Sequence, residues 1–271
     1  MRYLMIVAAL ATSILFASQV AGAAPPHGQW ITDCNLTHTL NDDPIVFPGQ
    51  PGASHQHSFF GNTATDANTT LESLMTVGKS KCRDIRERSA YWFPTLLDPQ
   101  GQPVLTGQQA VTYWSQNGDA ATTEMVPQGM NLVVGNRLAT GPQPHVLWQC
   151  NPTGSIKPRS PKEDHPFDCT AWNSSLQVFF TLPSCWDGQG TTGSHFSYTP
   201  CRAPFTHRIV KVTVRYTLGI QDPTGYSFSS GSLWSAHMDF INAWLPGRQE
   251  DLMAKCLNIG VNCGAISNTK P

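Results

Sequence analysis

The sequence is poor in charged residues. They make up 13% of its 271 residues, about half of the roughly 25% that is usual in globular domains. Seventeen basic side chains and 18 acidic ones give a formal net charge of −1, and no run of Lys or Arg occurs. This balance argues against a protein that binds nucleic acid by neutralising phosphates, so we expect no nucleic-acid partner.

Several motifs are also absent. The sequence contains no Gly-x-Ser-x-Gly elbow, so nucleophilic catalysis through Ser54 or Ser194 ranks last among the interpretations. It contains no Gly-x-x-x-x-Gly-Lys for binding phosphates. No Cys-x-x-Cys occurs, which argues against structural zinc. Beyond the N-terminus, no apolar run is long enough to cross a bilayer.

The N-terminus has the pattern of a secretory signal peptide. Arg2 precedes an apolar run over 3–16, and Ala21-Gly22-Ala23 fits the small-residue rule for cleavage. The run is shorter than the roughly 20 residues of a membrane span. We therefore predict a signal peptide over 1–23 and a single disulfide-stapled β domain over 24–271. The mature protein is expected to be secreted and extracellular, without membrane association.

Eight cysteines lie in the predicted mature part, and an even number in an exported chain indicates disulfides. Spacing does not choose among the 105 pairings that eight cysteines allow. Pairing between neighbours along the chain is our working prediction: Cys34–Cys82, Cys150–Cys169, Cys185–Cys201 and Cys256–Cys263.

The sequence pattern favours strands. Gly and Pro number 22 and 21, which argues against a helical bundle. Apolar and polar residues alternate over 207–219, which predicts a half-buried strand. Shorter strands are predicted over 130–134, 145–150 and 176–182, and one helix over about 246–257. The predicted fold class is all-β: a two-sheet sandwich of the jelly-roll kind with long loops and one short C-terminal helix. A β-rich α+β domain is the alternative.

Two stretches place chemically useful side chains on one face of a strand. His55 and His57 point the same way if their segment is extended, because successive side chains alternate. Two imidazoles a few ångströms apart can share a metal ion, or can flank a sugar or an anion. His237 and Asp239 have the same spacing. Such a pair can be a general base with its orienting carboxylate, part of a metal site, or a core hydrogen bond.

A third stretch follows a predicted strand and contains Trp186, Asp187 and His195. A loop held by a disulfide at Cys185 could present the aspartate and the histidine beside a flat indole, on which a sugar ring can stack. In the alternative interpretation Cys185 only staples a tight turn that Asp187 caps.

The motifs of these stretches occur together in one order: Asp43-Pro44-Ile45-Val46, Ser54-His55-x-His57 with Phe60-Gly61, Tyr91-Trp92-x-Pro94, Ser184-Cys185-Trp186-Asp187-Gly188, Ser194-His195 and His237-x-Asp239-Phe240-x-Asn242-x-Trp244. In this the chain resembles a secreted domain-of-unknown-function family of filamentous fungi and actinobacteria. Some fungal members of that family carry appended cell-wall carbohydrate-binding modules. The resemblance implies no activity, but it does imply that seven residues belong to one constellation: His55, His57, Trp186, Asp187, His195, His237 and Asp239.

Three hypotheses follow. The first is a protein directed at a polysaccharide or cell-wall glycan, which it binds or hydrolyses. The hydrolase would use Asp187 and Asp239 as a carboxyl pair about 5 to 10 Å apart, with His195 as a third catalytic residue and no required cofactor. Its ligand-binding residues would be His55, His57, Trp186, His237 and Trp244.

The second hypothesis is a metal-binding β-sandwich. Its ligands to a divalent metal would be His55, His57, His237 and Asp239, and their side chains would converge on one point. The third hypothesis is a non-catalytic structural module of the cell surface. It predicts exposed aromatic residues, with the histidines and aspartates scattered or merely hydrogen-bonded.

Overall fold

The computed structural model describes residues 27–118, 120–151 and 158–269. Its strands are β1 (Gln29–Leu40), β2 (His57–Gly61), β3 (Ala90–Pro94), β4 (Leu96–Leu97), β5 (Gln109–Ser115), β6 (Thr123–Glu124), β7 (Asn131–Gly135), β8 (Val146–Cys150), β9 (Leu176–Thr181), β10 (Cys185–Trp186), β11 (Phe196–Ser197), β12 (His207–Ile209), β13 (Lys211–Thr217), β14 (Ser227–Phe228), β15 (His237–Ile241) and β16 (Asn262–Ala265). The helices are α1 (Leu71–Thr76) and α2 (Arg248–Leu252), and α2 continues into a π-helical turn (Met253–Leu257).

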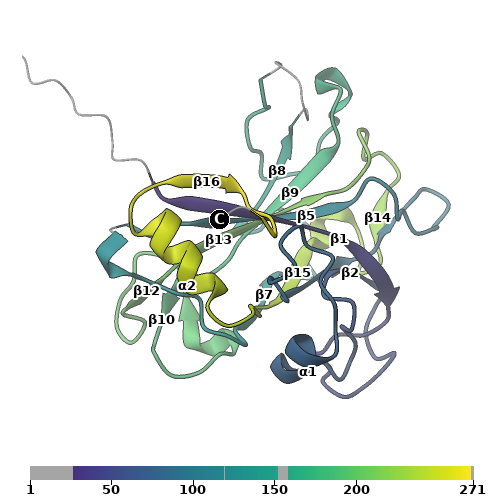
Figure 1. Ribbon diagram of the computed structural model, residues 1–271. Helices are drawn as coiled ribbons and strands as arrows, with labels where there is room; N and C mark the ends of the chain where they lie inside the picture. Colours follow the sequence, from purple (N-terminus) through teal and green to yellow (C-terminus); the bar gives the residue numbers. More distant parts are fainter. Residues whose placement is uncertain (1–26, 119, 152–157, 270–271) are drawn as a thin grey trace, which may run out of the picture.

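Two sheets share the long strand β1, which crosses the middle of the molecule (Figure 1). Its first part, Gln29–Asn35, pairs with β5, and the strand order continues through β13 and β9 to β8. Its last part, Leu36–Leu40, pairs with β2, and the order continues through β3 and β15 to β7. A register shift between Leu36 and His38 marks the passage from one sheet to the other. A four-stranded sheet, β11-β10-β12-β6, and the pair β14-β4 are separate from these two. The architecture confirms the predicted all-β, sandwich-like fold.

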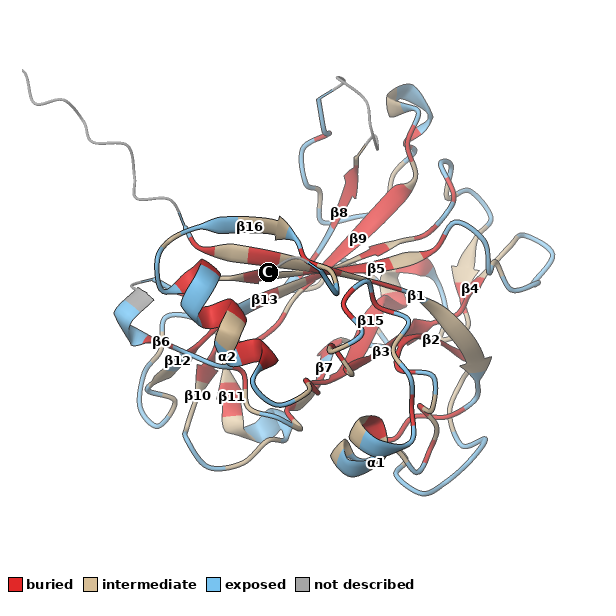
Figure 2. Ribbon diagram, viewed as in Figure 1, coloured by how far each residue is buried: buried red, intermediate tan, exposed pale blue. Residues whose placement is uncertain are grey.

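The main core lies between the two sheets and is rich in aromatic side chains. Trp30 stacks on Trp114 with ring centroids 5.7 Å apart, and Trp244 meets both indoles edge-on. Strand alternation explains the core, because Val212, Val214 and Tyr216 of β13 are fully buried while the residues between them are not. Figure 2 shows this buried centre surrounded by exposed loops.

A second apolar layer covers the opposite face of β2, β3 and β15. Phe60, Tyr91 and Phe240 belong to the main core, so their strand neighbours Phe59, Trp92 and Ile241 point the other way. These neighbours pack under α1, whose Leu74 is fully buried, and under the loop between β1 and β2. Thr70 caps α1 by accepting a hydrogen bond from the Ser73 backbone N–H. This outer face is the part of the fold that carries the candidate site.

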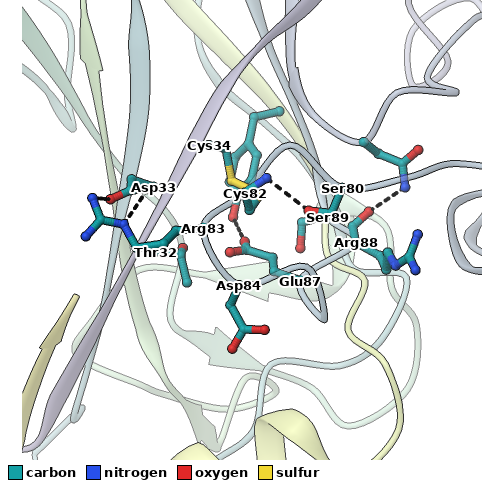
Figure 3. Close-up of a disulfide and its surroundings, with 12 residues drawn as sticks. Thr32, Asp33, Cys34, Ser80, Cys82, Arg83, Asp84, Glu87, Arg88 and Ser89 are labelled. Carbon is teal, nitrogen blue, oxygen red and sulfur yellow. Dashed lines mark hydrogen bonds and ion pairs between the residues drawn. A yellow bond between two sulfur atoms is a disulfide. The ribbon is translucent and has the colours of Figure 1, made fainter. Parts of the chain in front are cut away.

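The structure confirms the predicted disulfides, which join each cysteine to its neighbour along the chain: Cys34–Cys82, Cys150–Cys169, Cys185–Cys201 and Cys256–Cys263. Figure 3 shows the first of these, with the Arg83–Asp33 ion pair to one side and Glu87 close to the sulfurs. Each disulfide therefore closes a local loop within the β framework.

The predicted strands over 130–134, 145–150 and 176–182 are confirmed as β7, β8 and β9, with ends that differ by one residue. The strand predicted over 207–219 is divided at Val210 into β12 and β13. The predicted C-terminal helix begins two residues late, at Arg248. Helix α1 was not predicted, because its six residues are too few to show a helical period.

The predicted signal peptide over 1–23 lies outside the described residues. Among the helices that the structure does describe, none is both long and apolar enough to span a membrane.

Candidate metal centre

Three strands on the outer face bring His57, His237 and Asp239 together. β3 lies between β2 and β15, and its Pro94 pairs with His57 while its Trp92 pairs with Asp239. The same register continued by two residues places His237 level with Pro94. Since the proline ring is short, the two imidazoles can lean toward each other above it, with ring centroids 5.7 Å apart.

His55 completes a group of three imidazoles. It precedes β2, and its ring centroid lies 4.3 Å from that of His57 and 5.0 Å from that of His237. Its Nε2 atom is 3.2 Å from Nε2 of His237. One nitrogen from each of the three rings lies within 4.8 Å of the other two, so the three can bind a single ion. His57 and His237 are buried, whereas His55 is half-buried.

Backbone carbonyls fix the tautomers of the two buried histidines. Nδ1 of His57 lies 2.9 Å from the carbonyl oxygen of Asp42, and Nδ1 of His237 lies 2.8 Å from that of Ser235. A carbonyl oxygen only accepts, so each Nδ1 carries the proton and each Nε2 presents a lone pair. Nε2 of His57 is buried and has no hydrogen-bond partner. Protein-bound metals are typically held by histidines oriented in this way.

The three imidazoles are neutral at neutral pH. Burial lowers the pKa of His55 to about 4, and the charges of His237 and Arg137 add to the effect. Burial likewise lowers the pKa of His237 to about 4, although its hydrogen bond to Ser235 opposes the shift. Burial also holds the pKa of His57 well below its usual value. Neutral imidazole is the form that binds a metal.

Two carboxyl groups adjoin the histidines. Asp239 is fully buried, and neither of its carboxylate oxygens has a hydrogen-bond partner. Its Oδ2 lies 4.0 Å from Nε2 of His237. Asp43 accepts hydrogen bonds from the backbone N–H groups of Ile45 and Val46, each at 3.0 Å. Ligand atoms of Asp43, His57 and Asp239 also lie within 4.8 Å of one another, so His57 belongs to both groups.

Burial raises the pKa of Asp239 well above its ordinary value, and the charge of Asp43 raises it further. Burial also raises the pKa of Asp43, against the effect of its two backbone hydrogen bonds. A buried carboxylate without a partner is costly, and a bound cation would compensate it.

A pocket of about 480 Å³ leads to this cluster. His55, His237 and the two aspartates line its polar part, and Phe47 and Val133 line its apolar part. Arg137 stands on the rim and is exposed. A ligand from solvent can therefore reach the imidazoles.

The third predicted stretch forms a separate cluster. Asp187 Oδ2 lies 2.7 Å from Nδ1 of His195, and the indole N–H of Trp186 donates to the carbonyl of Gly190 at 2.7 Å. Partial burial opposes the shift, but the hydrogen bond with His195 helps to lower the pKa of the half-buried Asp187. Trp186 lines a different groove, of about 1,040 Å³, between the β6 segment and α2.

The structure thus divides the single constellation that the sequence suggested. Thr191 bonds to the first residue of β7, and Gly193 approaches Leu132, whose side chain faces the main core. His237 pairs with the last residue of β7, and Asp239 points to the outer face. Asp187 does not line the pocket that holds Asp239. The lining of this pocket therefore does not support the expected pairing of these two carboxyl groups in one cleft.

Trp244, expected to contact a ligand, is 1% exposed and packs against Trp30 and Trp114 in the core. This position gives Trp244 a packing role. Sequence reasoning did not select Asp43 as a ligand, although it lies in the Asp-Asp-Pro stretch that precedes the histidines. Arg137 was also missed. The Gly135-Asn136 pair, which is typical of a turn, directly precedes Arg137 and is the sequence signal that could have identified it.

Residues 43–244 match a protein family described as a domain of unknown function (DUF1996). The match spans most of the chain and includes all the residues of the cluster. Searches of curated proteins and of solved structures gave no match.

Proposed function

The chain belongs to the DUF1996 family, and we propose that it is a secreted metalloprotein that binds one divalent transition-metal ion. Its three ligands are the imidazoles of His55, His57 and His237, and the carboxylate of Asp239 lies next to them. Secretion is supported by the four disulfides, which form and persist in oxidising compartments. Asp43 lies beside the ligands and can accept a hydrogen bond from a water bound to the ion.

The orientation of the two buried imidazoles is the observation that carries this proposal. Their Nδ1–H groups are engaged by backbone carbonyls, so their lone pairs point into the cluster, next to the unpaired carboxylate of Asp239. With zinc–nitrogen bonds of about 2.0–2.1 Å, two ligands of a tetrahedral ion lie about 3.3 Å apart. The Nε2 atoms of His55 and His237 are 3.2 Å apart.

The ligand chemistry selects the class of metal. Imidazole nitrogen suits zinc, copper, nickel and iron, whereas calcium and magnesium prefer oxygen ligands. Zinc is therefore the ion of choice for the first test. The pocket beside His55 gives substrate or water access to the ion, an arrangement found in catalytic rather than structural sites. A zinc ion so placed would activate water for hydrolysis.

Isothermal titration with zinc tests the site, using the mature chain after removal of metal with a chelator. We expect one ion per chain, and a loss of affinity of at least about 100-fold in His57→Ala and in the half-buried His55→Ala. His165→Ala is the control, because His165 is exposed and bonds to the neighbouring Asp164. Wild-type protein that binds no zinc, copper, nickel or iron, or that binds with unchanged affinity in both variants, would contradict the proposal.

A second candidate function, glycan binding, is favoured by the groove at Trp186. This indole is half-buried, lies parallel to Phe196 within 14°, and is held by its bond to Gly190. Glu124, Gln128 and Gln249 line the same groove and can bond to hydroxyl groups. A polysaccharide or cell-wall glycan stacked on the indole would match these surfaces.

Sedimentation with insoluble cell-wall polysaccharides tests this candidate. We expect Trp186→Ala to abolish cosedimentation, while Trp172→Ala, another half-buried tryptophan that packs on Phe167, leaves it unchanged. Equal cosedimentation of wild type and Trp186→Ala would argue against the groove as the binding site.

A further inference from the structure

We propose that Arg137 is an anion-recognition residue and that the ligand of the pocket carries an oxyanion, a carboxylate or a phosphate. One oxygen of this group would bind the metal ion and another would bind the Arg137 guanidinium. This inference rests on the metal centre proposed above and names the chemical class of its substrate.

The turn after β7 places Arg137 at the pocket. Gly135 pairs with His237 and has a φ of +94°, and a side chain there would meet the carbonyl oxygen of Ala236 at 2.5 Å. The end of β7 can therefore come close to the start of β15 only with glycine at this position. Arg137 follows two residues later, so the backbone of the metal-site strands determines where it stands.

Two side chains hold this turn in place. Oδ1 of Asn136 accepts a hydrogen bond from the backbone N–H of Leu138 at 2.9 Å. Gln143 accepts one from the backbone N–H of Asn136 and donates to the carbonyl of Ala236, directly before His237. The turn is thus tied to β15, and Arg137 is presented by a fixed backbone.

Arg137 makes no ion pair or hydrogen bond with any of the residues that the structure describes. Other arginines of the chain are engaged: Arg83 pairs with Asp33, Arg86 with Asp84, and Arg248 with Asp84 and Asp251. Arg137 lines the same pocket as His55 and His237. An uncommitted guanidinium beside the ligands is available for a partner from solvent.

The charge balance points to an anion. A divalent ion and Arg137 together carry +3, while Asp239 and Asp43 supply at most −2. The loaded pocket therefore has at least one positive charge in excess, and both cations face the same space. A guanidinium binds a carboxylate or a phosphate through two parallel hydrogen bonds. Phe47 and Val133, the latter 43% exposed, offer contact to an apolar part of the same molecule.

Anion titrations of the cobalt-loaded protein test the inference, because the visible spectrum of cobalt responds to a new ligand. Acetate and inorganic phosphate are titrated separately, with acetamide as the neutral counterpart of acetate. We expect at least one of the two anions to change the spectrum and to bind roughly tenfold more weakly to Arg137→Gln. Arg137→Lys should retain part of the anion affinity, because lysine keeps the positive charge but cannot make the two parallel hydrogen bonds of a guanidinium. The anion that binds more tightly shows whether the ligand of the pocket carries a carboxylate or a phosphate.

Arg202→Gln is the matched control, since Arg202 is also exposed but lies outside the pocket. Cobalt affinity should be retained in all three variants. If cobalt binds and neither anion perturbs it, or if Arg137→Gln binds both anions as tightly as wild type, this inference is wrong while the metal centre stands. If the wild type binds neither zinc nor cobalt, the metal centre itself is wrong and this inference falls with it.

Discussion

At the scale of single residues, the buried polar groups of the outer face are arranged for a partner that side chains do not supply. The carboxylate of Asp239 and Nε2 of His57 are fully enclosed and unpaired, although neighbouring groups such as Asp42 are satisfied by backbone N–H groups. Most buried polar atoms in folded proteins have partners. The unpaired atoms therefore indicate a site in which binding takes precedence over stability.

The variant Asp239→Asn should separate the effect of Asp239 on stability from its effect on metal binding. Without metal, the variant avoids burying an unpaired carboxylate, so at pH 8 we expect its free energy of unfolding to rise by about 1–2 kcal/mol. With zinc, it lacks the negative charge beside the ion and should gain less stability from the ion than the wild type gains. Urea unfolding with chelator and with zinc measures both effects. A variant that is less stable without metal and equally stabilised by zinc would contradict this expectation.

Glu87 is expected to give the fold a pH dependence that does not involve the proposed metal site. It is fully buried and lies beside the Cys34–Cys82 disulfide (Figure 3). Its carboxyl group accepts a hydrogen bond from the hydroxyl of Tyr91. Burial raises the pKa of Glu87 to about 7, although its hydrogen bonds with Tyr91 and Thr32 lower it. The folded state therefore favours the protonated form. The stability that Glu87 contributes is present in full below its unfolded pKa of about 4.5 and is lost as the pH rises through 7.

Glu87→Gln stays neutral, so we expect its stability to fall less than that of the wild type between pH 4.5 and 8. The difference should be about 3 kcal/mol. Urea unfolding across this range measures it, and Glu72→Gln, on the exposed side of α1, serves as the control. Parallel curves for wild type and Glu87→Gln would show that the carboxyl group does not change its protonation on unfolding.

At the scale of elements, the junction between β7 and β15 decides the geometry of the pocket. Gly135→Ala introduces a side chain at positive φ and within 2.5 Å of the Ala236 carbonyl oxygen. We expect a loss of stability of about 1–3 kcal/mol and weaker zinc binding, because His237 must shift. Gly141→Ala is the control, as its new side chain would meet nothing within 4 Å. Unchanged zinc affinity in Gly135→Ala would show that the junction does not position His237.

Sequence pattern predicted the elements well where a two-residue period was present. Alternation within one strand placed His237 beside Asp239 and His55 near His57, because that rule needs no knowledge of other strands. It could not show that Pro94 would lie between the two histidine strands, since strand order is a property of the whole sheet. For the same reason it could not test the single constellation that the family resemblance implied. The segment that carries Asp187 and His195 contacts the start of β7, whereas Asp239 pairs with Val133 in its middle.

At the scale of the whole molecule, one strand joins the two sheets and four disulfides fasten the loops. The loop closed by Cys34–Cys82 spans 48 residues and that closed by Cys256–Cys263 spans 7. In the chain-entropy description, these crosslinks contribute about 4 and about 2 kcal/mol. Replacing both cysteines of the first pair by alanine should therefore lower stability more than replacing those of the second. Denaturant unfolding of the two double variants checks the order, and the reverse order would contradict the entropic account.

The nearest-neighbour order of the disulfides has a consequence for biogenesis. If the chain is exported as proposed, with its N-terminus leading through a membrane pore, the second cysteine of each pair emerges when its partner is the one thiol still unpaired, because the earlier pairs have already been oxidised. Oxidation in order of appearance then gives the native connectivity directly. Such a protein has little need of an isomerase, and its yield from a host should depend on the supply of oxidant rather than on the capacity for reshuffling.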